Sequence, residues 1–566
     1  MYLVDAVARS ADIRPHPMLH EQAVGIAAEA CAQYANSLGV ALVTTGPGAT
    51  NAITPCAAAW TDSTPIIFVS GQVKTQDSRK NYNVRQLGFQ EIPIVEMVSS
   101  ITKMAVQITG VEQIPATLKD LITAAISGRP GPVWLDIPLD IQSQTIEDKP
   151  LALISPLKFQ NALQAGILGE IVSQWQSANR PLLLLGNGVR LAGGVDLARK
   201  LVSESQTPTL LTWKALDILD TSDSLNAGRP GAIAQRWSNF AQQTADFVLV
   251  IGARLDLGQT AYRPENFAPH ATKYIVDVDS NELSKLMNVN ATFINADAKS
   301  FMAELLVQIE KSPVKNTDRR WVDRIQKWKN DYPLIQPKHL VPDSGVNLYY
   351  FISELSKIMN VDDLLVPGSS GACSEISMQA FQNKLGQRVL NSEGLGPMGF
   401  GIAAPLGACL ASEGRRTISI DGDGGFLMNI QELATLEFSK LPIKIIVLNN
   451  NGYGSIKASQ DRYFDGRRLG TDPTSLLGMP QLEGIVRGFN LPYYKIESHA
   501  LLTEKLNECF NAQGPGIIEL IVDPGQVTEP RVYTEISRDG RFQTSNMERL
   551  SPVLDETELL NALRFD

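Results

Sequence analysis

The chain has 566 residues, more than a single hydrophobic core accommodates, so two to four domains are expected. Its 44% hydrophobic and 19% charged residues are typical of an ordinary globular protein. The formal net charge of −10 argues against nucleic acid or an anionic membrane as the main partner, and no apolar stretch is long enough to span a bilayer. Five scattered cysteines without a CxxC pair indicate a reduced, cytoplasmic protein.

The first part of the chain, residues 1–147, alternates strand-like and helical patterns. Strand patterns lie at 39–45, 65–69 and 132–137, and a proline-bearing linker is predicted over 148–157. Alternation of this kind predicts a parallel sheet with helices on both faces.

The same alternation recurs twice further along the chain. Residues 158–312 carry strand patterns at 181–185, 247–251 and 273–278, and residues 345–530 form a third unit after a charged connection. Residues 531–566 are predicted to form a tail that contains a short helix from about Glu556. The expected fold class is therefore α/β, with three doubly wound parallel-sheet domains.

The most informative stretch is 417–452. It contains a strand pattern that ends in IDGDGG (420–425), a helical pattern at 429–440, and a second strand pattern that ends in NNNG (449–452). A right-handed βαβ crossover places both strand ends at one edge of the sheet, where open α/β sheets bind ligands. One carboxylate, one amide and exposed glycine backbone suit Mg²⁺ shared with phosphate groups. A lone GDG would more often be a simple tight turn.

These motifs resemble the thiamine-diphosphate motif of the acetolactate synthase (acetohydroxyacid synthase) large-subunit family. The resemblance implies that Asp423, Asn450 and the main-chain carbonyl of Gly452 hold the Mg²⁺ that anchors thiamine diphosphate. It also implies three domains that bind, in chain order, the pyrimidine ring, a nucleotide such as FAD, and the diphosphate. The glycines expected beside the phosphates are Gly422, Gly424 and Gly425.

Two further segments of the first domain resemble catalytic segments of this family. Glu21 in HEQ (20–22) matches the glutamate that contacts the aminopyrimidine ring and promotes its proton transfer. By itself, Glu21 would be a carboxylate at a helix N-terminus. Gln90 in FQE (89–91) matches a glutamine that lines the active site.

The segment GLGPMG (394–399) fits GxGxxG, which alone would suggest a dinucleotide site. It resembles instead the GLGxMG segment of the family, which implies that Gly396 and Met398 lie beneath the thiamine cofactor and impose its bent shape. A plain core methionine is the alternative. Ser369 and Ser370 stand where the family often has Gln-His, and they are expected to donate hydrogen bonds to the diphosphate.

The middle domain resembles the flavin domain of the family. The residues that fall where that domain contacts FAD are Gly188, Arg254, Asp277 and Asp297, together with Arg129 from the first domain. Related enzymes keep this fold while binding ADP or nothing, so an empty nucleotide domain is the alternative.

Four features depart from the family pattern. Only 20 residues precede Glu21, so the chain is expected to lack the family's first strand and helix. Ser459 replaces a substrate-selecting tryptophan, and Leu139 replaces a lysine at the acceptor channel. Gly425 replaces a serine. The changes at 459 and 139 weaken the expectation of branched-chain amino-acid biosynthesis and favour a wider acceptor site.

The resemblance implies decarboxylation of pyruvate, or a related 2-keto acid, followed by ligation of the acetyl unit to a second carbonyl compound. The alternatives are simple 2-keto acid decarboxylation, acetyl transfer to a keto-sugar nucleotide and a non-catalytic relative. The resemblance further implies a homodimer or homotetramer with active sites shared between chains. The expected cofactors are thiamine diphosphate, Mg²⁺ and FAD.

Overall fold

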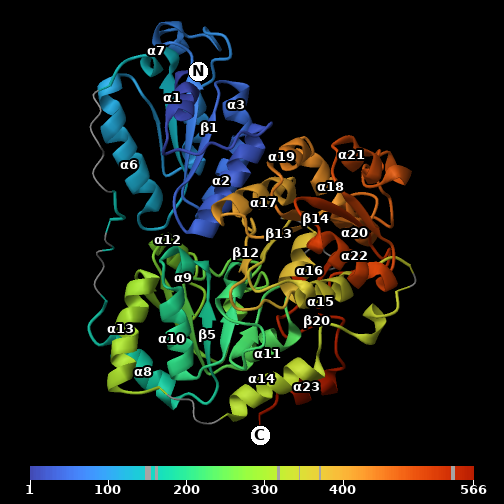
Figure 1. The fold of residues 1–566 in the computed structure, drawn as a ribbon. Coiled ribbons are helices and arrows are strands. Elements are labelled where there is room, and N and C mark those ends of the chain that lie inside the picture. The colour runs from blue at the N-terminus through green and yellow to red at the C-terminus, as the bar shows by residue number, and fades with distance from the viewer. Residues whose placement is uncertain are drawn as a thin grey trace.

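Three parallel-sheet α/β domains make up the computed structural model, as the sequence predicts (Figure 1). It describes residues 1–146, 154–157, 159, 163–314, 319–342, 344–368, 371–536 and 542–565. The predicted boundaries at 147 and 158 and much of the predicted linker lie outside these residues. In the described chain, no helix is both long and apolar enough to cross a membrane.

The first domain has a four-stranded parallel sheet in the order β1 (Gly39–Val43), β2 (Ile66–Gln72), β4 (Val133–Pro138), β3 (Met104–Gln107). The three predicted strands are confirmed, whereas β3 was missed. All four residues of β3 are only half-buried, so no buried apolar run marks this edge strand. The helices are α1 (Tyr2–Arg9), α2 (Glu21–Ala35), α3 (Pro47–Asn51), α4 (Ile53–Asp62), α5 (Ile94–Val98), α6 (Ile114–Ile126) and α7 (Leu139–Gln142).

The middle domain has a six-stranded sheet in the order β10 (Thr292–Asn295), β9 (Thr272–Asp277), β8 (Phe247–Ile251), β5 (Pro181–Leu185), β6 (Thr209–Leu211), β7 (Asn226–Gly228). The chain moves outward from β5 in one direction and from β8 in the other. The boundary between β5 and β8 is therefore the topological switch point, where such sheets bind ligands. The helices are α8 (Ile167–Ser177), α9 (Asn187–Leu191), α10 (Val195–Ser205), α11 (Arg236–Thr244), α12 (Ser280–Ser284) and α13 (Ala298–Lys311).

The third domain follows the connecting helix α14 (Arg320–Asp331). Its sheet has the order β12 (Arg388–Val389), β11 (Leu364–Pro367), β13 (Thr417–Gly422), β14 (Ile443–Asn449), β16 (Gly516–Ile521), β15 (Tyr493–Ile496). The predicted βαβ unit is confirmed, because β13 and β14 are parallel neighbours joined through α19. The helices are α15 (Leu348–Ile358), α16 (Ala372–Ala380), α17 (Phe400–Ala411), α18 (Asp423–Phe426), α19 (Glu432–Ser439), α20 (Gly454–Tyr463), α21 (Leu482–Gly488) and α22 (His499–Asn511).

The C-terminal tail returns to the middle domain. Its elements are β17 (Arg531–Val532), β18 (Thr534–Ile536), β19 (Phe542–Thr544), β20 (Leu550–Ser551) and the predicted helix α23 (Glu556–Leu563). The amide of Val532 donates to Ala232 O at 2.7 Å, and Arg236 donates to Pro552 O at 2.6 Å. The tail therefore joins the third domain to the middle one.

Helices α2 and α17 join the first and third domains and lie side by side in Figure 1. Their contact is made of small side chains, including the buried Ala23, Ala30, Ala403 and Ala404. A Cβ atom at Gly407 would lie only 2.0 Å from Ala27 O, so the helix backbones approach more closely there than any other residue would allow. Small residues thus set the distance between the two domains.

This close approach leads to a stability prediction. Gly407→Ala should destabilise the protein by about 1–3 kcal/mol and lower its melting temperature, because the added methyl group must push α2 and α17 apart. Gly484→Ala is the matched control. It lies in α21, where a Cβ atom would meet nothing within 4 Å, so the change should be neutral or stabilise by about 0.4–1 kcal/mol. Thermal unfolding followed by circular dichroism would contradict the packing argument if the two variants melted alike.

Candidate active site

The carboxyl ends of β11, β13 and β14 meet at one edge of the third sheet. The amide of Gly452, which follows β14, donates to Asp423 Oδ2 at 2.9 Å, so the two predicted strand ends do come together. The amide of Gly368 after β11 donates to Ile420 O in β13 at 2.5 Å. A Cβ atom at Gly371 would lie 2.6 Å from Ser455 Oγ at the start of α20. The ends of these three strands are therefore packed closely together at one edge.

Asp423 is 2% exposed at this edge. Burial raises the pKa of its carboxyl group to about 6, and the amides of Gly452 and Gly424 oppose that rise. A cation beside the carboxylate would favour its ionised form. The amide nitrogen of Asn450 lies close over Gly454 on the neighbouring turn. Among the described residues no group of three or more His, Cys, Asp or Glu is suited to a metal ion, so a cation beside Asp423 would depend largely on amide and main-chain oxygens.

The glycines in the turns after β13 and β14 differ in how much space surrounds them. A Cβ atom at Gly422 would meet no atom within 4 Å, so this position leaves space for a ligand. At Gly424 and Gly425 a Cβ atom would collide with Tyr453 and Asp421, at 2.2 and 2.3 Å respectively. Gly452 has φ +145°, and its Cβ atom would lie 2.0 Å from Thr471 O. Close packing thus requires glycine at 424, 425 and 452, whereas Gly422 borders open space.

Asp421 is a buried carboxylate at this edge that the sequence analysis missed. Its Oδ1 accepts from the amide of Gly422 at 2.9 Å, and Cβ atoms at Gly368 and Gly401 would come within 2.5 and 2.6 Å of its oxygens. Burial raises the pKa of Asp421 to about 7. The sequence did contain a signal for this residue, because Asp421 stands two positions before Asp423 at the end of β13.

The loop 394–399 leads into α17, and its end lies against Met428 and Asn429. Gly396 has φ +65° and Gly399 has φ +88°. Asn429 Nδ2 donates to Gly399 O at 3.1 Å, which fixes the end of the loop next to the turn after α18. Met398 is half-buried. Ser369 and Ser370 lie outside the described residues, so their predicted contacts with the diphosphate stay predictions.

The first domain carries the other half of the candidate site. Glu21 is the first residue of α2, and its Oε2 accepts from Asn51 Nδ2 at 3.0 Å. A Cβ atom at Gly48 would lie 3.2 Å from Glu21 Oε1. Gln90 has φ +62° and packs its backbone over Gly46 of the same turn. The structure therefore brings Glu21 and Gln90 to one turn at the carboxyl end of β1.

A long-range contact ties this half-site to the third domain. Glu432 Oε1 accepts from the amides of Leu19 and His20, at 3.0 and 2.9 Å. Glu432 is fully buried and starts α19, which follows the Asp423 turn. The sequence analysis missed Glu432 because no local pattern marks a contact that spans more than 400 residues.

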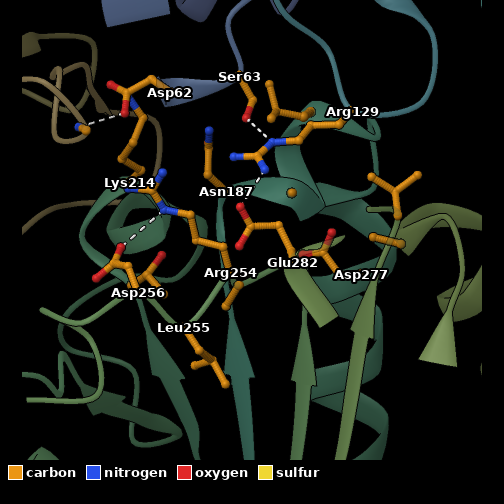
Figure 2. A pocket seen from close by; sticks show the side chains of 18 of the residues that line it. Asp62, Ser63, Arg129, Asn187, Lys214, Arg254, Leu255, Asp256, Asp277 and Glu282 are labelled. Carbon is orange, nitrogen blue, oxygen red and sulfur yellow. Dashed lines mark hydrogen bonds and ion pairs between the residues drawn. The ribbon is translucent and has the colours of Figure 1, made fainter. Parts of the chain in front are cut away.

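A separate cavity of about 1110 Å³ lies at the switch point of the middle domain (Figure 2). The structure brings together all five residues that were predicted to contact FAD, since each lines this cavity: Gly188, Arg254, Asp277, Asp297 and Arg129. Gly188 and Gly252 touch closely at the ends of β5 and β8, where a Cβ atom at 188 would lie 2.8 Å from Gly252 Cα. Burial raises the pKa of Asp277, which lies at the end of β9.

The Arg129 side chain at the cavity wall is paired with carboxylates of the middle domain (Figure 2). It forms ion pairs with Glu282 at 2.5 Å and Asp279 at 3.1 Å, and its Nε donates to Ser63 Oγ at 2.8 Å. Burial disfavours the guanidinium charge, but these two carboxylates outweigh burial and raise the pKa of Arg129. The pair with Glu282 links the first and middle domains across the cavity.

Comparison with known families agrees with this architecture. Residues 1–97 match the thiamine pyrophosphate enzyme N-terminal TPP binding domain, residues 168–305 the central domain, and residues 369–520 the C-terminal TPP binding domain. The fold and its strand-end site thus define a thiamine-pyrophosphate-dependent enzyme.

Full-length relatives narrow the class. The chain is 31% identical to the acetolactate synthase isozyme 1 large subunit of Escherichia coli, over 93% of this chain and 90% of the relative. It is 32% identical to acetolactate synthase 1 of Zea mays (96% and 85%) and 30% identical to a probable acetolactate synthase large subunit of Methanocaldococcus jannaschii (90% and 85%). The chain belongs to the acetolactate synthase large-subunit family of thiamine pyrophosphate enzymes.

Proposed function

We propose that the chain decarboxylates pyruvate, or a related 2-keto acid, and ligates the acetyl unit to a second carbonyl compound. The observation that carries the proposal is Glu21, whose carboxylate stands at a strand-end turn with Asn51 and Gly48 against it. Thiamine diphosphate would supply a thiazolium ring that accepts the electron pair left on the substrate carbon when CO₂ departs.

Glu21 holds and returns the proton exchanged with the aminopyrimidine ring nitrogen. Asn51 occupies Oε2, which leaves Oε1 for that nitrogen, and Gly48 keeps the space beside Oε1 free of a side chain. Gln90 lies next to the same turn, where it is suited to orient the substrate. Gly396 and Met398 support the cofactor from the loop before α17.

The diphosphate end is assigned to the edge of the third sheet. Asp423, Asn450 and the carbonyl of Gly452 fit Mg²⁺, which prefers oxygen ligands and shares its coordination shell with phosphate groups. The open space beside Gly422 fits the phosphate groups themselves.

FAD is proposed for the central cavity. Arg254 and the glycines at the ends of β5 and β8 would hold the diphosphate, and Asp277 a ribose hydroxyl, as an acidic residue does in dinucleotide folds. The proposed reaction involves no net oxidation. FAD would therefore act by binding, and would stabilise the packing of the domains whose residues line the cavity.

A homodimer with shared active sites is also proposed. A cytoplasmic location is proposed as well, on the basis of cysteine usage alone. Large apolar side chains stay exposed around both half-sites. In the first domain these are Leu19 (63% exposed) and Phe89 (85%), and in the third Leu395 (46%) and Met428 (45%). Exposed apolar groups that surround one site favour an interaction surface there, and a second copy of the chain would cover them.

Replacing the proposed acid tests the mechanism. Glu21→Gln should lower kcat by about 10²–10⁴-fold, because an amide cannot exchange the proton, while thiamine diphosphate still binds. The product that the wild-type chain forms from pyruvate distinguishes the candidate reactions. Acetolactate indicates carboligation, acetaldehyde indicates simple decarboxylation, and neither product contradicts both. The surface variant Glu96→Gln of the same domain serves as control. Unchanged turnover in Glu21→Gln would remove this residue from the mechanism.

Subunit mixing tests the shared site. Inactive Glu21→Gln and Asp423→Ala chains, mixed under conditions of subunit exchange, should recover about a quarter of the wild-type activity. Both lesions fall into one site of a mixed dimer and leave the other intact. A mixture of Glu21→Gln with Glu21→Ala is the control and should stay inactive. No recovery despite verified exchange would place each complete site within one chain.

Flavin titration tests the cavity assignment. Arg254→Met should weaken FAD binding by about tenfold or more, since one charged hydrogen-bond donor is lost. Arg263→Met is the control, because Arg263 pairs with Glu265 outside the cavity lining. Binding is followed by flavin fluorescence. Equal affinity for ADP, or no affinity for either nucleotide, would contradict the assignment.

A further inference from the structure

Asp62 joins all three domains at the wall of the central cavity. It is the last residue of α4, and its side chain is 1% exposed. From the middle domain, Lys214 Nζ lies 3.0 Å from Asp62 Oδ2. From the third domain, the amides of Glu393 and Gly394 donate to Asp62 Oδ2 and Oδ1 at 3.0 and 2.8 Å. One carboxylate thus accepts three hydrogen bonds from two other domains.

Lys214 holds the same stretch of backbone from the other side. It lies in the 3₁₀ helix Trp213–Ile218 after β6, and its Nζ also donates to Asn391 O at 2.6 Å. Gly394 is pressed against α4, since a Cβ atom there would lie 2.6 Å from Thr61 Cβ. The pair Asp62–Lys214 therefore fixes residues 391–394 directly before Gly396 and Met398.

Two further carboxyl groups, those of Glu29 and Glu393, lie near Asp62. Burial is the main cause that raises the pKa of Glu29 and of Glu393 to about 8, and the neighbouring Asp62 adds to this rise. Both carboxyl groups therefore hold protons at neutral pH. Among the ion pairs of the described residues, Lys214 is the cation that pairs with Asp62. A buried ion pair is strongly weakened when one partner loses its charge.

We propose that Asp62 is a positioning residue for the thiamine cofactor, because it fixes through the Glu393 and Gly394 amides the start of the loop that carries Met398. The inference rests on the proposed role of that loop. Asn429 fixes the end of the loop through Gly399 O, so Asp62 completes a two-ended anchor. The carboxylate acts from the first domain on a loop of the third domain and contacts no reacting atom.

The test compares Asp62→Asn with Glu282→Gln. Both are isosteric changes that remove one carboxylate from an ion pair between the first and middle domains, but among the contacts described for Glu282 none reaches residues 391–399. Asp62→Asn should raise the Kd for thiamine diphosphate with Mg²⁺ about tenfold, measured by titration calorimetry on the full chain. Amide exchange of the peptide 391–399 should become faster. Glu282→Gln should change neither quantity.

Lys214 supplies an independent arm. Lys214→Gln should weaken cofactor binding in the same direction, and the double variant with Asp62→Asn should be no weaker than the stronger single variant, because both act through one contact. If the Asp62→Asn chain does not fold, Lys214→Gln with the exchange measurement carries the test. The KM for pyruvate at saturating cofactor should stay within about twofold of the wild type in every variant.

The outcomes separate this inference from the proposed function. A wild-type chain that does not bind thiamine diphosphate would overturn the proposed function. A wild type that binds, with Asp62→Asn equal to Glu282→Gln in both Kd and amide exchange, would overturn the role of Asp62 alone.

Discussion

The close contact between α2 and α17 is the constraint on which both half-sites depend. Gly407 allows the backbone of α17 to approach Ala27 O in α2, and no larger residue fits there. Helix α2 begins with Glu21, and α17 begins directly after the Met398 loop. One helix pair therefore sets where the acid of the first domain and the cofactor loop of the third domain lie. Both ends of α2 are also tied down: Glu432 accepts the Leu19 and His20 amides, and Arg388 donates to Gln33 O and Tyr34 O at 3.0 and 3.1 Å.

The middle domain acts on this arrangement through the end of α4. Arg254 donates to Thr61 O at 2.8 Å, and Lys214 pairs with Asp62. Arg129 of the first domain donates to Ser63 and is itself held by Glu282 of the middle domain. Residues 61–63 line the central cavity, and Thr61 and Asp62 also contact Gly394 of the loop 391–394. A ligand in the cavity and the loop of the thiamine site thus share one short segment of the first domain. This gives the middle domain a physical reason to be part of the enzyme even though the reaction does not need its cavity for electron transfer.

Much of the fold and the strand-end site could be predicted because the signals are local. Buried runs such as 247–251 and 443–448 are strands that end in glycine or asparagine, and parallel crossovers bring such ends together. Asp62 and Glu432 could not be found in this way. Glu432 lies at a helix N-terminus, where a carboxylate is favoured, and Asp62 at a helix C-terminus, where it is not, but neither position identifies a partner in another domain. Their partners lie hundreds of residues away, and only the tertiary packing of three domains makes them anchors.

The electrostatics of the third-domain edge support the proposal that a divalent cation and the diphosphate bind there together. Burial raises the pKa of Asp423 to about 6 and that of Asp421 to about 7, so the protein alone disfavours negative charge at this edge. A diphosphate alone would add more negative charge to a site that already resists it. A divalent cation beside Asp423 would stabilise that carboxylate, and the diphosphate would then offset the remaining charge of the cation. In this proposal each ligand lowers the free-energy cost of binding the other, and one acidic side chain would suffice because phosphate oxygens would provide further ligands to the cation.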